Sequence, residues 1–175
     1  MCGLFGYIGS GADGQIISKA AYLASTRGPH GWGVFWSRHG GNRVLKRIGS
    51  MVDLSAKLEG AEVVVGHCRL ATFGSYSDQD QLQPFVLGEV VTAINGNIYN
   101  YKETGYPVRF GNDAEVLPYL VRDYGAGNFK QAADIRNYAM LAYDGKKLWA
   151  KNNRLPLLRL EHSTGVYYCS REIKT

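Results

Sequence analysis

The stretch MCGLFGYIG, residues 1–9, places a cysteine directly before a short apolar segment that is typical of a β-strand. Cys2 has two interpretations. As a small apolar residue, it simply begins a buried strand. If Met1 is removed, Cys2 instead carries a thiol and a free α-amino group, which titrates at about 7.7–8.0 and can act as a base for its own side chain. The rest of the chain decides between a structural cysteine and an N-terminal nucleophile.

The composition is that of one ordinary folded domain covering residues 1–175. Hydrophobic residues make up 45% of the chain and charged residues 20%, which argues against a disordered chain and allows a sizeable core. The net charge of +5 is scattered along the sequence, whereas a nucleic-acid-binding face needs clustered Lys and Arg. We therefore expect no nucleic-acid partner.

The three cysteines, at positions 2, 68 and 169, form no CxxC pair, and their odd number fits a reducing compartment better than a disulfide framework. The cysteines and the four histidines show no metal-ligand spacing. The N-terminus lacks a basic region, and its apolar run is too short for a signal peptide or a membrane span. These features predict a cytoplasmic protein with no metal, no cofactor and no membrane partner.

The order of the expected elements predicts an α+β domain. Apolar residues at helical spacing predict a helix over 15–26, and a second helix over 112–125 begins with a capping box of Asn112 and Glu115. Pro118 conflicts with the second helix and should kink it or shorten its start. A shorter helix is expected near 129–135, and strands or hairpins are expected over 3–8, 32–48, 62–72, 88–94, 138–151 and 157–170. Because hairpins dominate, the sheets should be mostly antiparallel and covered by helices.

The segment GSGADG, residues 9–14, matches the GxGxxG pattern of dinucleotide-binding turns. Such a site also needs an acidic residue about 20 residues later, at the end of a second parallel strand. Residues 31–38 contain no acid, and their strand enters a hairpin. We interpret the glycines as a flexible loop.

Four further stretches carry residues that are common in catalytic sites: RGPHG at 27–31, GHCRLAT at 66–72, NGNIYN at 95–100 and NDAEV at 112–116. Each also has a structural explanation when taken alone. Cys68 fits a buried core position, and Arg69 on the opposite strand face fits a surface ion pair. Asn95-Gly96 is a common hairpin dipeptide, and Asp113 suits the N-terminal end of a helix.

Taken together with Cys2-Gly3, these stretches resemble the glutaminase domain of class II glutamine amidotransferases, a branch of the N-terminal-nucleophile hydrolases. The resemblance runs from residue 2 to about residue 172, and GHCRLAT and NGNIYN are its most specific parts. It implies a four-layer αββα sandwich with mostly antiparallel sheets. Asn97 stands where the related asparagine synthetases carry Glu, so the resemblance does not point to that branch.

The resemblance also implies a catalytic set. Cys2 would attack the side-chain amide of L-glutamine to form a γ-glutamyl thioester, with its own α-amino group as general base and then acid. The Asn95 side-chain N–H and the Gly96 backbone N–H would form the oxyanion hole. Arg27 matches an arginine that supports this end of the site from behind. Gly3 would let the backbone approach the substrate closely.

A second set of residues would bind the amino-acid part of glutamine. Arg69 is suited to a planar, bidentate grip on the α-carboxylate, with Thr72 beside it. Asp113 would pair with the α-ammonium, and Asn97, next to the oxyanion residues, is also assigned to substrate binding. Together Arg69 and Asp113 would select an amino acid over a simple amide.

Three hypotheses for the function remain. The favoured one is a glutaminase that supplies ammonia to a separate synthetase in trans, because the sequence shows no P-loop with which to use the ammonia itself. The second is an amidohydrolase of the same fold that cleaves another γ-glutamyl amide. The third is a catalytically silent domain that binds glutamine or a partner protein.

Overall fold

The computed structural model describes residues 1–71 and 77–173. Runs of strands are interrupted by helices along the chain. In chain order they are β1 Gly3–Gly9, α1 Gly14–Ser25, β2 Gly31–Arg38, β3 Gly41–Ile48, α2 Ser55–Leu58, β4 Val63–Arg69, η1 Gln79–Gln81, β5 Phe85–Leu87, β6 Val90–Asn95, η2 Tyr101–Thr104, η3 Asp113–Val116, α3 Leu117–Tyr124, η4 Phe129–Gln131, β7 Tyr138–Tyr143, β8 Leu148–Asn153, β9 Leu158–His162 and β10 Gly165–Cys169.

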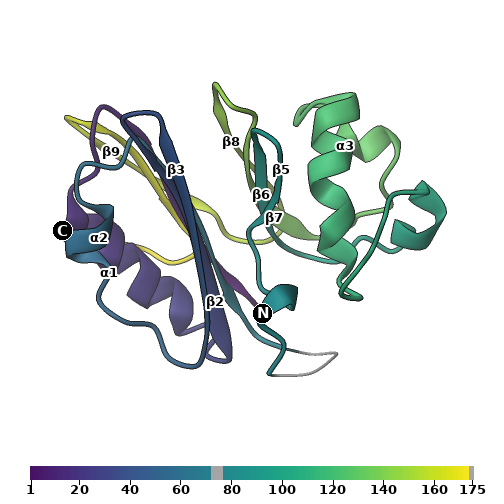
Figure 1. The fold of residues 1–175 in the computed structure, drawn as a ribbon, viewed down its shortest axis with the longest axis horizontal. Helices are drawn as coiled ribbons and strands as arrows, with labels where there is room; N and C mark the ends of the chain where they lie inside the picture. Colours follow the sequence, from purple (N-terminus) through teal and green to yellow (C-terminus); the bar gives the residue numbers. More distant parts are fainter. Residues whose placement is uncertain (72–76, 174–175) are drawn as a thin grey trace.

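The strands form two sheets that pack face to face. The six-stranded sheet has the order β3-β2-β4-β1-β10-β9, and the four-stranded sheet has the order β5-β6-β7-β8. All the ladders between these strands are antiparallel. Helices α1 and α2 cover the outer face of the larger sheet, and α3 covers the outer face of the smaller one (Figure 1). The expected α+β fold, a four-layer αββα sandwich, is confirmed.

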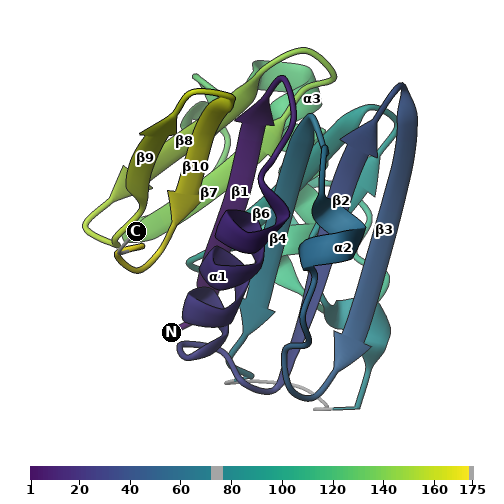
Figure 2. The ribbon, with the colours of Figure 1, turned by 90° about the vertical axis from the view of Figure 1, so that its left-hand side faces the viewer.

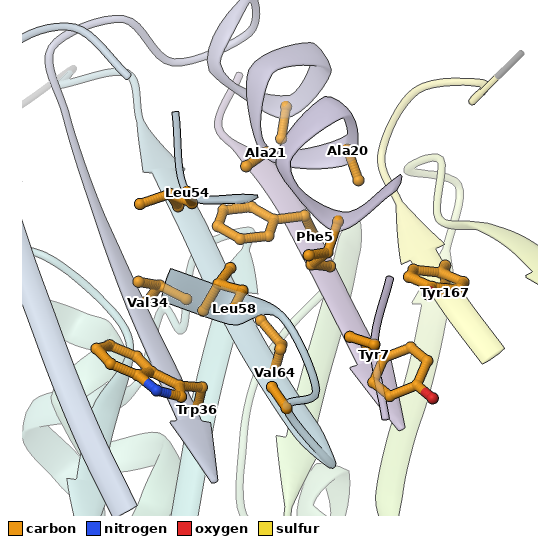
Figure 3. Close-up of a cluster of buried hydrophobic side chains, with 14 of the residues drawn as sticks. Phe5, Tyr7, Ala20, Ala21, Val34, Trp36, Leu54, Leu58, Val64 and Tyr167 are labelled. Carbon is orange, nitrogen blue, oxygen red and sulfur yellow. The ribbon is translucent and has the colours of Figure 1, made fainter. Parts of the chain in front are cut away.

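The opening stretch of the sequence forms the central strand β1, between β4 and β10 in the larger sheet. Figure 2 shows α1 lying across this strand. Successive side chains of β1 point to opposite faces of the sheet. Phe5 and Tyr7 are fully buried against the helices, in the cluster of Figure 3. Leu4 is buried on the other face, in one cluster with Ala93 and Leu141 of the smaller sheet. Both faces of β1 are therefore core, which explains its continuous apolar sequence.

The expected hairpin between β2 and β3 is present, and its strands pair from Gly31 opposite Ile48 to Arg38 opposite Gly41. Its two turn residues, His39 and Gly40, both have positive φ, of 51° and 75°. Two positive φ angles match the type I′ turn, whose twist suits the right-handed twist of the flanking strands. The two hairpins expected near the C-terminal end, β7-β8 and β9-β10, are also present.

Pro118 changes the second expected helix in the way that its chemistry requires. The segment is a 3₁₀-helix, η3, followed by the α-helix α3, in which Pro118 lies within the first two positions. Proline is tolerated there because the N–H groups of the first turn have no partner within the helix. The expected capping box of Asn112 and Glu115 is confirmed at the start of η3.

Several short elements differ from the sequence-based expectation. The segment expected to be helical near 129–135 forms only the 3₁₀-turn η4. Strand β5 and helix α2 were not anticipated, because segments of three and four residues are too short to establish a period. Their positions depend on the sheets that they pack against.

The GxGxxG segment is a loop that leads into α1, and carboxylates of the chain itself occupy the start of this helix. The Asp13 side chain accepts hydrogen bonds from the backbone N–H groups of Gln15 and Ile16. The Glu59 carboxylate accepts one from the N–H of Gly14, over 2.7 Å. The donors that would hold a phosphate at a helix N-terminus are therefore already used.

Candidate active site

One cavity, of about 410 Å³, lies beside η3, where β1 begins and where β4 and β6 end. Six of the eight site residues expected from the sequence line it, namely Cys2, Arg69, Asn95, Gly96, Asn97 and Asp113. Arg27 lies behind Cys2, and Thr72 falls outside the described residues. The residues come from both sheets, so the cavity exists only where the sheets are packed together.

The Cys2 thiol is held at the end of β4. Its Sγ lies 3.4 Å from the backbone nitrogen of Leu70, which donates to it, and 3.8 Å from the Leu70 carbonyl oxygen. Burial is the largest influence on the thiol and raises its pKa. The Leu70 hydrogen bond and the positive charges of the chain terminus, Arg69 and Arg27 act in the opposite direction. A thiol with a raised pKa is protonated near neutral pH, so it needs a base before it can act as a nucleophile.

Asn95 faces Cys2 across the junction between the two sheets. The backbone N–H of Cys2 donates to the Asn95 side-chain oxygen over 3.2 Å. This contact fixes the orientation of the amide, because the opposite orientation would place two donors against each other. The Asn95 Nδ2 group is buried and has no hydrogen-bond partner among the described residues. A buried amide donor without a partner is costly, and an oxyanion in the cavity is the kind of group that would satisfy it.

Gly96 follows Asn95 at the point where β6 ends and the chain turns. Its φ is +153°, and a Cβ atom added there would lie 2.9 Å from the carbonyl oxygen of Asn137. A side chain at this position would have to displace neighbouring backbone. Glycine thus lets the chain turn directly after Asn95, with the backbone of Gly96 facing the cavity.

Two residues support Cys2 from the side away from the cavity. The Arg27 guanidinium donates through Nε to the carbonyl oxygen of Cys2, over 3.3 Å. Gly3 packs against the end of α1, and a Cβ atom at this position would lie 2.1 Å from the carbonyl oxygen of Ala24. The steric need for glycine therefore comes from the helix. The expectation that Gly3 also lets the backbone approach the substrate closely stays a prediction.

Arg69 is buried, and the surface ion pair considered for it is wrong. The alternation of β4 places Cys68 against the helices and Arg69 on the other face, as expected. That other face is covered by the smaller sheet, so only 8% of Arg69 is exposed. Its Nη2 donates to the side-chain oxygen of Gln81 over 2.8 Å. A guanidinium held in this way at a cavity wall presents planar donors to a carboxylate.

Asp113 lies at the start of η3, directly after the capping residue Asn112. One of its carboxylate oxygens, Oδ2, accepts a hydrogen bond from the backbone N–H of Ile98 over 2.6 Å. Burial is the largest influence on this carboxyl group and raises its pKa, while the backbone hydrogen bonds act in the opposite direction. The cavity therefore has a guanidinium on one wall and a carboxyl group on another.

The cavity residues that sequence reasoning missed include three polar ones, His67, Gln81 and Gln83. The Gln83 side chain pairs with the backbone of Ile94, accepting from its N–H over 2.7 Å and donating to its carbonyl over 3.1 Å. The amide nitrogen of Gln83 also lies 3.4 Å from Nε2 of His67, which assigns an acceptor role to that ring nitrogen and the proton to Nδ1. Burial is the main cause that lowers the pKa of His67 to about 3, so the ring is neutral. His67 lies two residues before Arg69, so the two side chains share one face of β4. This spacing was the signal in the sequence that could have identified His67 as a cavity residue.

The described residues offer neither a cluster of metal ligands nor a membrane-spanning helix. Within residues 1–71 and 77–173, no group of three or more His, Cys, Asp or Glu side chains is arranged to hold a metal ion. Across the same ranges, no helix has the length and apolar character needed to cross a membrane.

No protein-family model matches the chain. Curated relatives do match it. The chain is 31% identical over 144 residues to the glutamine–fructose-6-phosphate aminotransferase (isomerizing) of Clostridium acetobutylicum, a match that covers 75% of this chain and 24% of the relative. It is 29% identical over 184 residues to the protein of the same name from Symbiobacterium thermophilum, covering 98% of this chain and 27% of the relative. The chain thus spans about a quarter of the length of these curated relatives.

Solved structures share the fold. Glutamine phosphoribosylpyrophosphate amidotransferase from B. subtilis superimposes with a TM-score of 0.74 at 21% identity, covering 97% of this chain and 42% of that one. A glutamine aminotransferase class-II domain protein from Silicibacter pomeroyi superimposes with a TM-score of 0.62 at 11% identity, covering 96% of this chain and 88% of that one. At these identities the likeness establishes the sandwich architecture.

Proposed function

Since the chain belongs to the class II glutamine amidotransferases, we propose that it hydrolyses L-glutamine to glutamate and ammonia through an N-terminal cysteine thioester. Two observations support this proposal. Cys2 lies in a cavity beside an amide donor that has no partner among the described residues. A buried guanidinium and a carboxyl group line the same cavity, as a free amino acid requires.

We also propose a cytoplasmic location for the protein. Its three cysteines are all free, which fits a reducing compartment.

The reaction begins once Met1 is removed and the nitrogen of Cys2 becomes a neutral amine. This amine takes the thiol proton, and Sγ attacks the side-chain carbonyl carbon of glutamine. The carbonyl oxygen becomes an oxyanion, which the Asn95 Nδ2–H and Gly96 N–H groups stabilise. The C–N bond then breaks, and the Cys2 ammonium returns its proton to the departing ammonia. Water, deprotonated by the same amine, attacks the thioester, releases glutamate and restores the thiol.

The amino-acid end of the substrate is held by two opposite charges. Arg69 pairs with the α-carboxylate, and Asp113 pairs with the α-ammonium. Asn97 lines the rim of the cavity and completes the proposed substrate-binding set. Thr72 keeps its sequence-based assignment beside Arg69. A simple carboxamide lacks both charged groups and would make neither of these contacts, which makes the site selective.

The single observation that carries the proposal is the pairing of the Cys2 nitrogen with the Asn95 oxygen, which leaves the Asn95 Nδ2 donor for the reaction. The test is the intact mass of the purified protein before and after treatment with a diazoketone analogue of glutamine. We expect a mass lacking Met1, followed by one covalent adduct that maps to Cys2. A processed chain that is not labelled would favour another γ-glutamyl amide as substrate, or a silent binding domain.

We further propose that the ammonia is used by a separate synthetase in trans. The proposal is supported by the relatives, whose names describe amino-group transfer. The isolated chain should release glutamate and free ammonia in equal amounts. A γ-glutamyl anilide hydrolysed faster than glutamine would instead indicate an amidohydrolase that supplies no ammonia.

A further inference from the structure

Gln81, the last residue of η1, joins the two charged sides of the cavity. Its side-chain Oε1 accepts a hydrogen bond from Nη2 of Arg69 over 2.8 Å. Its backbone carbonyl accepts a second one from Nδ2 of Asn112 over 2.9 Å. Asn112 directly precedes Asp113. One glutamine residue therefore connects the guanidinium wall with the segment that carries the carboxyl group.

The connection on the Asp113 side is rigid because Asn112 has several roles. Its Oδ1 accepts from the backbone N–H of Ala114, which holds the start of η3. Its own backbone N–H donates to the Glu115 carboxylate over 2.9 Å. The amide that caps η3 is thus the same amide that binds Gln81. A displacement of Gln81 would be transmitted directly to the first residue of η3, Asp113.

Gln81 itself is held firmly by its neighbours in the chain. Leu82 is buried, and the Gln83 side chain is paired with both backbone groups of Ile94. The residues that follow Gln81 thus fix it to the larger and the smaller sheet. The carboxamide of Gln81 can therefore hold the Arg69 guanidinium in one orientation.

The chemistry of a carboxamide suits this position. Its oxygen accepts a hydrogen bond and orients the guanidinium, yet the carboxamide is neutral and adds no negative charge that would compete with an incoming carboxylate. A carboxylate at position 81 would form an ion pair with Arg69 and compete with the substrate. An apolar side chain would remove this acceptor from a buried donor.

We propose that Gln81 is a positioning residue that sets the separation and orientation of Arg69 and Asp113, and thereby determines selectivity for free α-amino-acid amides. The inference rests on the proposed function, because it takes these two residues as the binding groups for the α-carboxylate and the α-ammonium. Gln81 acts through Arg69 and Asn112, and it takes no part in the bond-breaking steps.

The test compares Gln81→Met and Gln81→Glu with the matched control Gln79→Met, all in the chain with Met1 removed. Gln79 belongs to the same short helix, but it is exposed and its amide donates to the Lys46 carbonyl. Three quantities are measured for each variant: the Kd for L-glutamate by calorimetry, and the KM and kcat for L-glutamine. The ratio of kcat/KM for L-glutamine to that for 4-aminobutanamide, which lacks the α-carboxylate, reports selectivity.

We expect Gln81→Met to raise Kd and KM about tenfold, as the loss of a hydrogen bond to a charged group implies, with kcat unchanged. Gln81→Glu should raise both about 100-fold, because the new carboxylate neutralises Arg69. Selectivity against 4-aminobutanamide should fall by the same factors, since this analogue makes no carboxylate contact. Gln79→Met should behave as the unmodified chain. A thermal melt of each variant establishes that it is folded.

Unchanged Kd, KM and selectivity in folded Gln81→Glu would overturn the role of Gln81 while leaving the proposed function intact. The experiment can also contradict the proposed function while supporting the role of Gln81. A chain that binds L-glutamate in a Gln81-dependent way but hydrolyses no glutamine would support this inference and contradict the proposed function. An unmodified chain that neither binds L-glutamate nor hydrolyses L-glutamine would overturn both.

Discussion

The backbone nitrogen of Cys2 lies 3.2 Å from the side-chain oxygen of Asn95, although 93 positions separate the two residues in the sequence. Cys2 precedes the central strand of the larger sheet, and Asn95 ends a strand of the smaller one. The contact thus connects the proposed nucleophile and its base to the proposed oxyanion donor. It also makes both groups dependent on the same packing of sheet on sheet.

Replacing the nucleophile should remove activity without removing the fold. Cys2→Ala is expected to abolish glutamine hydrolysis, because no other thiol lines the cavity within the described residues. Cys2 precedes β1 and is only partly buried, so the free energy of unfolding should change by less than about 1 kcal/mol. Glutamate release and urea unfolding measure the two effects. Turnover retained in Cys2→Ala would contradict the proposed mechanism.

Asn95→Asp tests the oxyanion donor with almost no change in shape. The carboxylate keeps an acceptor for the Cys2 nitrogen, but it replaces the Nδ2 donor with a negative charge. We expect kcat to fall about 10²- to 10³-fold, the usual effect of losing one such donor. The KM for L-glutamine should change much less, since the side-chain amide of the bound substrate is neutral and becomes an oxyanion only during the reaction. A large change in KM with an unchanged kcat would assign Asn95 to binding.

Asp113→Asn tests the proposed contact with the α-ammonium. The new amide oxygen can still accept from the Ile98 N–H, so η3 should remain in place. The KM for L-glutamine should rise about 10- to 100-fold, as expected for a lost charged hydrogen bond. Hydrolysis of glutaramic acid, which lacks the α-amino group, should be unaffected. Asp123→Asn, at an exposed ion pair with Arg122, is the control and should leave KM unchanged.

Gly3→Ala should destabilise the fold through the contact with α1. A methyl group at this position would lie 2.1 Å from the Ala24 carbonyl oxygen, so the strand or the helix must move. We expect a loss of about 3 kcal/mol in the free energy of unfolding. Gly127→Ala is a suitable control, because no atom lies within 4 Å of the added methyl group. Equal stability of the two variants in urea would argue against the close packing of Gly3.

The buried His67 should make stability depend on pH. Its pKa is about 3 in the folded chain, compared with 6.5 for an unperturbed histidine, so the unfolded chain binds a proton that the folded chain does not. Stability is therefore unaffected above about pH 6.5 and falls as the pH decreases toward 3. Between pH 7 and pH 4.5 this residue should account for a loss of about 2–3 kcal/mol.

Urea unfolding of His67→Gln at both pH values isolates this contribution, because the other titrating groups are common to both proteins. The variant should lose less stability on acidification than the unmodified chain. His39→Asn, at the exposed β2-β3 turn, should show the same pH dependence as the unmodified chain. Parallel profiles for all three proteins would contradict the assignment of a neutral, buried His67.

The periodic parts of the fold were predictable from the sequence, and the contacts between distant segments were not. Alternation along β4 correctly placed Cys68 and Arg69 on opposite faces. It could not indicate that a second sheet covers the Arg69 face, because that sheet is formed by residues that come later in the chain. From the sequence alone, a polar residue on one face of a strand can therefore be expected either to face solvent or to line a cavity.

The same distinction between features that leave a pattern in the sequence and contacts between distant segments applies to the candidate site. Cys2, Asn95 and Asp113 lie in motifs whose residue types suit the chemistry, and the sequence indicated them. Gln81 lies in a non-periodic segment and acts through a side-chain contact with Arg69 and a backbone contact with Asn112. Neither contact leaves a pattern in a single sequence. Such residues are found only when the segments that they join are seen together.

Because the cavity lies at the junction of the two sheets, the reactivity of the Cys2 thiol reports whether the two sheets are packed together. Cys2 precedes β1 and Arg69 ends β4, both strands of the larger sheet, whereas Asn95 ends a strand of the smaller one. If the sheets separate while each keeps its hydrogen-bonded ladders, the backbone signal of the strands persists and the Cys2 environment is lost. Alkylation of Cys2 during a denaturant titration would then follow the docking of the two layers, which circular dichroism alone does not distinguish from strand formation.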